Sequence, residues 1–346
     1  MGIDLKDLVP RTPISLEALS GKVIAIDAYN ALYQFLSIIR QPDGTPLRDR
    51  SGRITSHLSG LLYRTVNFLE IGIKPVYVFD GRPPEVKEME VLRRKKVKEE
   101  AVKKYEEALQ RGDLKAARTY AQQTAHLTDE MVDEAKRLLD ALGVPWVQAP
   151  SEGEAQAAYM TIKGDAYAAA SQDYDSLLFG AKRLARNLTI SGKRKLPRRE
   201  EYIEIEPELI ELTKVLQELQ ITREQLIDIA ILIGTDYNPD GVKGIGPKTA
   251  LKLIKTYGSL ERALKALPEA EFPIDPLEIR KMFLEPKVTN DYKLEWRKPN
   301  VDAVLGFLCD ERDFSRDRVM NALSRVLKAY EQHAKQASLD LFFKKR

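Results

Sequence analysis

The sequence predicts an α/β fold with a largely parallel central sheet flanked by helices. Short apolar runs at residues 23–26 and 75–79 are typical of strands buried on both faces, and helical patterns separate such runs. The chain has 346 residues, 43% hydrophobic and 31% charged, which suffices for a large core and excludes a disordered chain. The single cysteine, Cys309, excludes an internal disulfide framework and fits a reducing compartment.

The expected elements alternate along the chain, as in a parallel sheet. Strands are expected at residues 23–26, 75–79, 144–147 and 167–171, and helices at 56–70, 129–142 and 154–162. Gly143 ends the second of these helices, and Ser151 with Glu154 predicts a capping box that opens the third. After Arg199 we expect helices, including a strongly apolar one at 226–233 and several over 259–335.

Two segments stand out by their charge. Residues 84–123 are highly charged, favour helix and contain few large apolar side chains, with one clear break at Gly112 and Asp113. This pattern indicates a solvated helical hairpin. The net charge of only +3 does not by itself indicate nucleic-acid binding. However, residues 176–199 contain no acidic residue and many lysines and arginines.

Seven acidic residues stand where the predicted topology brings side chains to one edge of the sheet. Asp27 and Asp80 end strands, and the carboxyl ends of parallel strands form the crevice in which α/β sheets bind ligands. Asp173 and Asp175, two apart on an extended segment, would point to the same side. The seven are Asp27, Asp80, Glu152, Glu154, Asp173, Asp175 and Asp236. Each alone is equally well explained as a cap, a turn residue or a surface charge, but their joint pattern favours a cluster.

Such a cluster requires counter-charge, because carboxylates repel one another. Oxygen-only ligands select Mg²⁺ or Mn²⁺, and three histidines with one cysteine do not favour a zinc site. Two ions about 3.5–4 Å apart activate water and stabilise an in-line phosphoryl displacement. The sequence therefore predicts a two-metal phosphodiester hydrolase.

Further residues are suited to phosphate. Gly244 and Gly246 allow close backbone approach. Pro247 suits the first turn of a helix that also contains Lys248, and the N-terminus of this helix favours anions. The segment fits a hairpin that grips a DNA backbone, or a tight turn between packed helices. Lys87 and Arg94 lie seven residues apart and share a helix face, from which they could reach a phosphate or merely confer solubility.

The tail over 336–346 ends in Phe342 and Phe343, and exposed aromatic residues at a terminus are costly unless they dock. They could fill a groove on a partner or fold back on the core. No apolar run reaches the roughly 18–20 residues of a membrane span, and no signal peptide opens the chain. We therefore expect a soluble intracellular protein.

Together these segments resemble the flap endonucleases, the structure-specific 5′ nucleases of DNA replication and repair, over nearly the whole chain. The most specific segments are 76–81, 149–155, 173–175, 234–237 and 244–248. The resemblance implies a PIN-like 5′-nuclease fold with a helical arch and a helix-hairpin-helix-type DNA-binding element. It implies one nuclease domain over 1–335, comprising an N-terminal region (1–83), the arch (about 84–123), a second catalytic region (124–240), the DNA-binding element (about 226–260) and C-terminal helices (261–335), followed by a clamp-binding tail (336–346).

The resemblance also implies roles for single residues. The seven acids would bind two Mg²⁺ ions, for which Mn²⁺ can substitute, and Lys87 and Arg94 would form the catalytic basic pair. Tyr33 would stack on the substrate near the cleavage point, and Gly2, after removal of Met1, would lie close to the active site. The glycine hairpin would bind the downstream duplex and hold a K⁺ ion. The four clamp-binding positions would be Gln336, Leu339, Phe342 and Phe343.

The implied activity is removal of 5′ flaps from branched DNA during replication (Okazaki fragment maturation) and repair, with associated 5′–3′ exonuclease activity. The implied partners are branched DNA and the replication sliding clamp (PCNA), and we expect a monomer. The chain ends three residues after Phe343, without the basic extension of eukaryotic members, which suggests an archaeal, cytoplasmic protein. The alternatives are a related junction resolvase or exonuclease and a non-catalytic, clamp-tethered DNA-binding adaptor.

Overall fold

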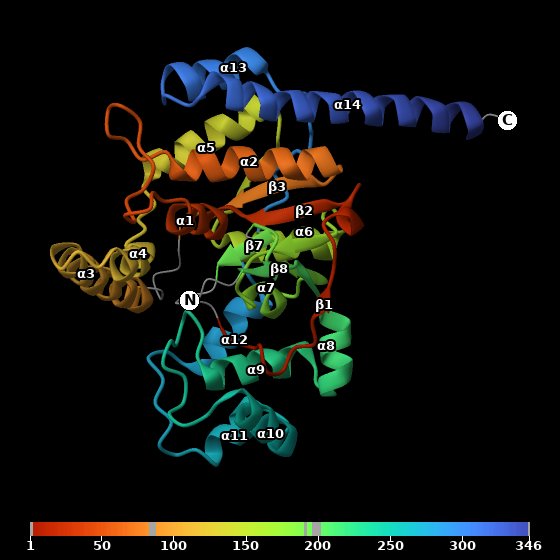
Figure 1. The fold of residues 1–346 in the computed structure, drawn as a ribbon. Helices are drawn as coiled ribbons and strands as arrows, with labels where there is room; N and C mark the ends of the chain where they lie inside the picture. Colours follow the sequence, from red (N-terminus) through yellow and green to blue (C-terminus); the bar gives the residue numbers. More distant parts are fainter. Residues whose placement is uncertain (1–2, 83–87, 190–191, 196–201, 345–346) are drawn as a thin grey trace.

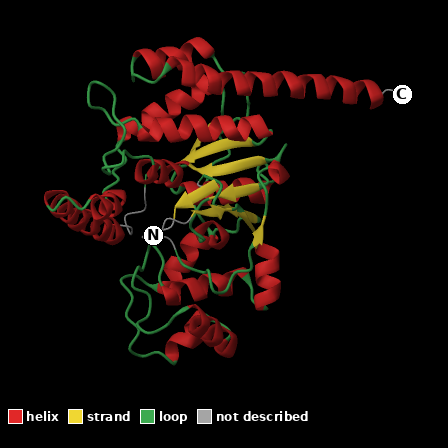
Figure 2. Cartoon of the chain, in the orientation of Figure 1, coloured by secondary structure: helices red, strands yellow, loops and turns green. Residues whose placement is uncertain are grey.

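The computed structural model describes residues 3–82, 88–189, 192–195 and 202–344. Its centre is a seven-stranded sheet in the order β1-β9-β6-β5-β2-β3-β4 (Figures 1 and 2). The strands are β1 Thr12–Pro13, β2 Val23–Asp27, β3 Lys74–Phe79, β4 Trp146–Gln148, β5 Ala168–Ala170, β6 Arg183–Arg186 and β9 Glu208–Glu211. The five strands from β6 to β4 run parallel. At one edge β9 pairs antiparallel with β6, and β1 pairs antiparallel with β9. The prediction of a largely parallel sheet is confirmed.

Helices cover both faces of the sheet (Figure 1). They are α1 Ala28–Ile38, α2 Ser56–Ile71, α3 Glu88–Gln110, α4 Leu114–Gln123, α5 Asp129–Leu142, α6 Gly153–Lys163, α7 Asp175–Leu178, α8 Leu212–Leu219, α9 Arg223–Ile233, α10 Pro247–Tyr257, α11 Leu260–Lys265, α12 Pro276–Leu284, α13 Val301–Leu305 and α14 Arg316–Lys344. A short 3₁₀ helix lies at Glu17–Leu19 and a π-helical turn at Gly306–Asp310. Within the described ranges, no helix combines the length and the apolar character that a membrane span requires.

Alternate residues of the parallel strands face two separate hydrophobic cores. Ile24 and Ile26 of β2 pack with α1, α2, α5 and α14 on one face, whereas Ala25 packs with α6, α9, α10 and α12 on the other. Val76 and Val78 of β3 face the same second core as Ala25. This two-residue period explains why the strands read as continuous apolar runs. The sheet is therefore the middle layer, and its polar residues lie where the strands end.

The structure corrects the helices expected directly after Arg199. Two strands come first: β8 (Tyr202–Ile205) pairs antiparallel with β7 (Gly192–Lys195) as a separate hairpin, and β9 pairs with β6. Each of these strands has only four residues, which is too short for a periodic pattern to separate strand from helix. Their pairing partners, rather than local propensity, decide their conformation.

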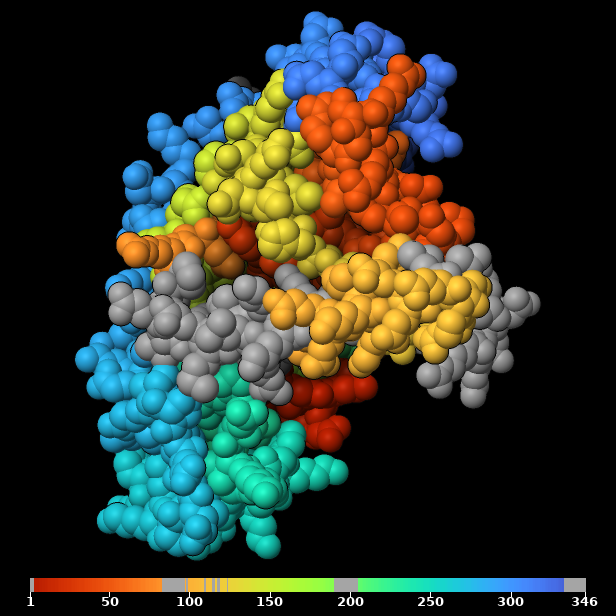
Figure 3. Space-filling view, turned by 90° about the vertical axis from the view of Figure 1, so that its left-hand side faces the viewer, coloured from red at the N-terminus to blue at the C-terminus, as the bar shows by residue number. Residues whose placement is uncertain are grey.

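The charged segment predicted as a helical hairpin contains α3 and α4, which pack against each other. The predicted break is confirmed: Gly112 has φ +68°, and Asp113 caps α4 by accepting a hydrogen bond from Ala116 N at 3.0 Å. Both helices project from the body on the side toward which β2 and β3 run (Figures 1 and 2). Figure 3 looks onto this side, where the gold residues of α3 and α4 lie between the α2 layer and the α9–α11 region.

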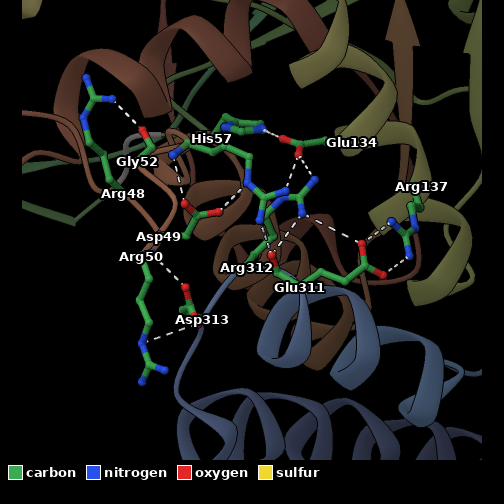
Figure 4. A network of polar contacts seen from close by, with 11 residues as sticks. Arg48, Asp49, Arg50, Gly52, His57, Glu134, Arg137, Glu311, Arg312 and Asp313 are labelled. Atoms are coloured by element: carbon green, nitrogen blue, oxygen red, sulfur yellow. Dashed lines mark hydrogen bonds and ion pairs between the residues drawn. The ribbon is translucent and has the colours of Figure 1, made fainter.

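A buried polar network ties the first half of the chain to the segment before α14 (Figure 4). Glu134 of α5 accepts hydrogen bonds from His57 Nε2 at 2.9 Å and Arg312 Nε at 2.7 Å. One turn later, Arg137 forms a bidentate pair with Glu311. Burial alone would raise the pKa of Glu134, but the hydrogen bonds from His57 and Arg312 outweigh it and lower that pKa.

Candidate metal centre

Asp27 is the carboxylate at the end of β2. It also caps α1, because its Oδ1 accepts a hydrogen bond from Asn30 N at 2.9 Å. Its side chain is largely buried. Burial and the negative charges of Asp80 and Asp173 raise the pKa of Asp27 well above its ordinary value, despite the hydrogen bond from Asn30. The ends of β2 and β3 and the loop after β5 thus bring three predicted acids together.

Asp80 follows β3 and binds the first residue of α6. Its Oδ1 accepts a hydrogen bond from Gly153 N at 2.5 Å. A Cβ at position 153 would lie 2.7 Å from that oxygen, so any other residue would push the carboxylate away. The predicted capping box of Ser151 and Glu154 is wrong. The N-cap residue of α6, Glu152, makes no side-chain cap, and Asp80, which directly follows β3, accepts a hydrogen bond from the Gly153 N–H instead.

Glu154 lies in the first turn of α6 among other carboxylates. Burial raises its pKa well above the ordinary value, and the negative charges of Asp175, Asp27 and Asp173 raise it further. Such mutual effects fall off with distance, so these four carboxylates are neighbours. Among the described residues, Glu154 Oε1 is buried and has no hydrogen-bond partner. An acceptor oxygen in that position is suited to a cation.

Asp173 and Asp175 reach the cluster, but not from the expected extended segment. Asp175 is the first residue of α7, and Tyr174 before it has helical backbone angles (φ −90°, ψ −2°), so the expected extended geometry is wrong. Asp175 Oδ1 accepts a hydrogen bond from Ile3 N at 3.1 Å, which holds the beginning of the chain beside the acids. Asp173 Oδ2 accepts a longer one from Asn30 Nδ2 at 3.4 Å.

Glu152 and Asp236 meet the cluster around Tyr237. The Tyr237 hydroxyl donates a hydrogen bond to Glu152 Oε2, and the tyrosine side chain is buried. Burial raises the pKa of this hydroxyl, and the negative charges of Glu152, Asp175 and Asp236 raise it further. Asp175 thus neighbours both Glu154 and Tyr237. The structure therefore brings all seven predicted acids into one region. Tyr237 was not predicted to support them, because no sequence pattern marks a tyrosine as the donor to a distant glutamate.

The cluster has the donor chemistry of a hard divalent cation, because its ligating atoms are all carboxylate oxygens. The raised pKa values of Asp27 and Glu154 reflect burial and mutual repulsion, which positive charge between the acids would relieve. As they stand, no three His, Cys, Asp or Glu side chains of the described residues are arranged to hold one metal ion.

A chain of amide and hydroxyl groups supports the cluster from α1. Asn30 contacts Asp27 and Asp173, Gln34 Nε2 donates to Asn30 Oδ1 at 2.8 Å, and the Thr189 hydroxyl donates to Gln34 Oε1. Asn30 and Gln34 lie one turn apart on the same face of the helix. Sequence reasoning missed this support, since polar residues at that spacing are also typical of any exposed helix face.

The structure places two other predicted site residues and leaves two outside its description. Tyr33 lies half-buried on α1 against the first core, and Arg94 lies on α3. Gly2 and Lys87 fall outside the described residues, although Ile3 directly after Gly2 contacts Asp175.

The predicted glycine hairpin lies between α9 and α10, which pack together. Gly244 has φ +81°, Gly246 is the N-cap of α10, and both have open space where a side chain would begin. Lys248 is exposed in the first turn of α10. The turn and the N-terminus of α10 are thus open to solvent.

The four predicted partner-binding positions lie on α14. The structure continues this helix to Lys344, so they belong to a helix that extends away from the body rather than to a separate tail (Figure 1). Those positions are Gln336, Leu339, Phe342 and Phe343.

Comparison with known proteins places this arrangement in a family. The model of the XPG N-terminal domain matches residues 1–101, and that of the XPG I-region matches residues 143–236. Flap endonuclease 1 of Staphylothermus marinus is 63% identical over 345 residues, covering 99% of each chain. That of Hyperthermus butylicus is 63% identical over 350 residues, covering 100% of each.

A solved structure agrees with these sequence relatives. Flap endonuclease-1 from Methanococcus jannaschii is 44% identical to this chain and superposes with a TM-score of 0.76. The match covers 96% of this chain and 100% of that one. Since the likeness extends from end to end and includes the strand ends that carry the acids, the chain belongs to the flap endonuclease 1 family.

Proposed function

We propose that this protein removes 5′ flaps from branched DNA by hydrolysing a phosphodiester bond with the help of two Mg²⁺ ions, for which Mn²⁺ can substitute. The observation that carries the proposal is the gathering of seven carboxylates where the parallel strands end. Glu154 Oε1, which is buried and has no hydrogen-bond partner in the described part of the chain, lies within that group. Membership of the flap endonuclease 1 family supports the choice of substrate.

The chain's own residues hold and orient this centre. The ligands would be Asp27, Asp80, Glu152, Glu154, Asp173, Asp175 and Asp236. When bound, two divalent ions supply the positive charge that activates water and stabilises the phosphate being cleaved. Asn30 fixes Asp27 and Asp173 by hydrogen bonds, and Gly153 N fixes Asp80. These contacts hold the carboxylates in place before DNA arrives.

The elements around the acid cluster would bind the flap and the duplex of the DNA substrate. We assign α3 and α4 to a helical arch around the flap, with Lys87 and Arg94 directed to the scissile phosphate and Tyr33 stacked on a base. The position of both helices beside the strand ends supports this role (Figures 1 and 3). The turn with Gly244, Gly246 and Lys248 would bind the downstream duplex through phosphate contacts, with a K⁺ ion on its backbone oxygens.

The C-terminal end of α14 would bind a partner. Gln336, Leu339, Phe342 and Phe343 match the four positions of a sliding-clamp motif, so we assign the protein to replication and repair as a clamp-tethered monomer. Their common helix and its projection from the body support accessibility to a partner (Figure 1).

The test is cleavage of labelled flap DNA by Asp173→Asn and Asp27→Asn, each with and without Mg²⁺. Removing one ligand charge should lower the rate by at least about a thousandfold while DNA affinity in Ca²⁺ stays within about threefold. Asp302→Asn removes an exposed acid of α13 and serves as the matched control. If Asp173→Asn cuts at the wild-type rate, the metal assignment is wrong.

The same assay separates the alternative functions. Faster cleavage of four-way junctions or of nicked duplex than of flaps would indicate a resolvase or an exonuclease. Tight binding without any product in Mg²⁺ or Mn²⁺ would indicate a non-catalytic adaptor.

A further inference from the structure

The Tyr237 side chain is held tightly by its neighbours. Its side chain is only 3% exposed, and its ring meets Phe283 edge to face with centroids 5.3 Å apart. Phe283 in turn packs on Phe179 at 4.9 Å. The backbone is held as well, because Tyr237 N donates to Thr235 Oγ1 at 3.1 Å. The hydroxyl therefore has little freedom to move.

The turn that carries Tyr237 is itself rigid. Thr235 Oγ1 donates to Asn238 Oδ1, and Asn238 Nδ2 donates to Ile231 O, both at 2.7 Å. Gly241 has φ +54°, and a Cβ there would lie 2.2 Å from Ile233 O. This turn joins the buried helix α9 to the acids, so the position of the Tyr237 hydroxyl is set by the core.

Glu152 presents its carboxylate to the turn that carries Tyr237. It precedes α6 as the N-cap residue, yet its side chain makes no cap hydrogen bond. A glutamate side chain has three rotatable bonds, and fixing it in one orientation costs conformational entropy. The hydrogen bond from Tyr237 to Glu152 Oε2 selects one orientation. A carboxylate oxygen accepts hydrogen bonds, so the tyrosine hydroxyl is the donor in this contact.

We propose that Tyr237 is a positioning residue that presents the Glu152 carboxylate to a divalent ion at the acid cluster. The inference rests on the proposed function, because it requires that the cluster binds divalent ions. It adds that the residue after Asp236 contributes to metal affinity without touching the metal. Outer groups that orient a ligand typically change metal affinity about 10–100-fold.

The test compares Mn²⁺ binding, followed by the electron paramagnetic resonance of free Mn²⁺ without DNA, in wild type and Tyr237→Phe. The variant keeps the ring that packs on Phe283 and loses only the hydroxyl. We expect about tenfold weaker Mn²⁺ binding and a similar rise in the Mg²⁺ concentration that half-saturates cleavage. Tyr330→Phe, which loses a hydrogen bond to Arg297 O away from the cluster, is the matched control and should bind Mn²⁺ like wild type.

A double-mutant cycle guards against a merely structural effect. If Tyr237 acts through Glu152, the change Tyr237→Phe should add nothing to Mn²⁺ affinity in a Glu152→Ala background. An equal loss in both backgrounds, or wild-type Mn²⁺ affinity in Tyr237→Phe, would overturn the inference. Asp173→Asn separates failure of the proposed metal centre from failure of this inference. If Asp173→Asn also binds Mn²⁺ like wild type, the proposed metal centre is wrong. If only Tyr237→Phe binds Mn²⁺ like wild type, the role assigned to Tyr237 is wrong and the metal centre stands.

Discussion

At the scale of single residues, the site depends on contacts that aim each carboxylate. The clearest is the contact of Asp80 Oδ1 with Gly153 N, because it joins β3 to the start of α6 across 73 residues of sequence. The sequence identified both Asp80 and Glu154 as candidate ligands but assigned the cap of α6 to Ser151. A capping box is a local sequence pattern. The observed acceptor, Asp80, directly follows β3 and is distant in sequence, so residues near α6 do not predict it.

The change Gly153→Ala tests this contact. The added Cβ would lie 2.7 Å from Asp80 Oδ1 and must displace that carboxylate. We expect flap cleavage at limiting Mg²⁺ to fall at least about tenfold while the protein stays folded. Gly306→Ala is the matched control, because a Cβ there meets open space and its backbone is helical (φ −56°). Equal activity of the two variants would show that the position of Asp80 is unimportant.

At the scale of elements, apolar periodicity predicted the buried strands and the helices α2, α5 and α6 to within a few residues. It failed for β8 and β9, where four-residue strands depend on their partners. The packing of α9, α11 and α12 was also not predictable, because ion pairs between residues distant in sequence link these helices. Arg280 of α12 donates to Asp228 of α9 at 2.7 Å and to Glu261 of α11 at 2.8 Å.

The stabilising contribution of Glu261 to this helix junction should be lost in acid. The hydrogen bond from Arg280, opposed by burial, lowers the pKa of Glu261 from its ordinary value of 4.5 to about 2. Because the folded-state pKa is the lower one, Glu261 contributes stability above about pH 4.5 and loses that contribution as the pH falls toward 2. Melting temperatures of wild type and Glu261→Gln should therefore differ at pH 6 and converge between pH 4.5 and 2. Two parallel curves across that range would contradict the assignment.

At the scale of the whole molecule, the acids meet because one sheet joins segments that are far apart in sequence. The sequence predicted the members of the cluster. The distances between them depend on the parallel pairing of β2 with β3 and β5 and on the turn after α9. On one face of the sheet, hydrogen bonds among His57, Glu134 and Arg312 link α2, α5 and the segment before α14 (Figure 4). Nothing in the spacing of these three residues indicates that they meet.

Glu134→Gln tests whether this network holds the layers together. The variant leaves Arg312, which is only 8% exposed, beside a neutral amide. Removing one partner of a buried ion pair costs about 3–5 kcal/mol, so the free energy of unfolding in denaturant should fall by about that amount. Asp133→Asn, at an exposed position one residue earlier in α5, should change it by less than about 0.5 kcal/mol. A loss below about 1 kcal/mol for Glu134→Gln would mean that the network is dispensable.

The most direct test of the metal centre is anomalous diffraction from crystals of the full chain grown with Mn²⁺. Two peaks about 3.5–4 Å apart should lie among the seven carboxylates, with Glu154 among the ligands. Mn²⁺ bound elsewhere on the protein, with none between Asp27, Glu154 and Asp173 at saturating concentration, would contradict the account.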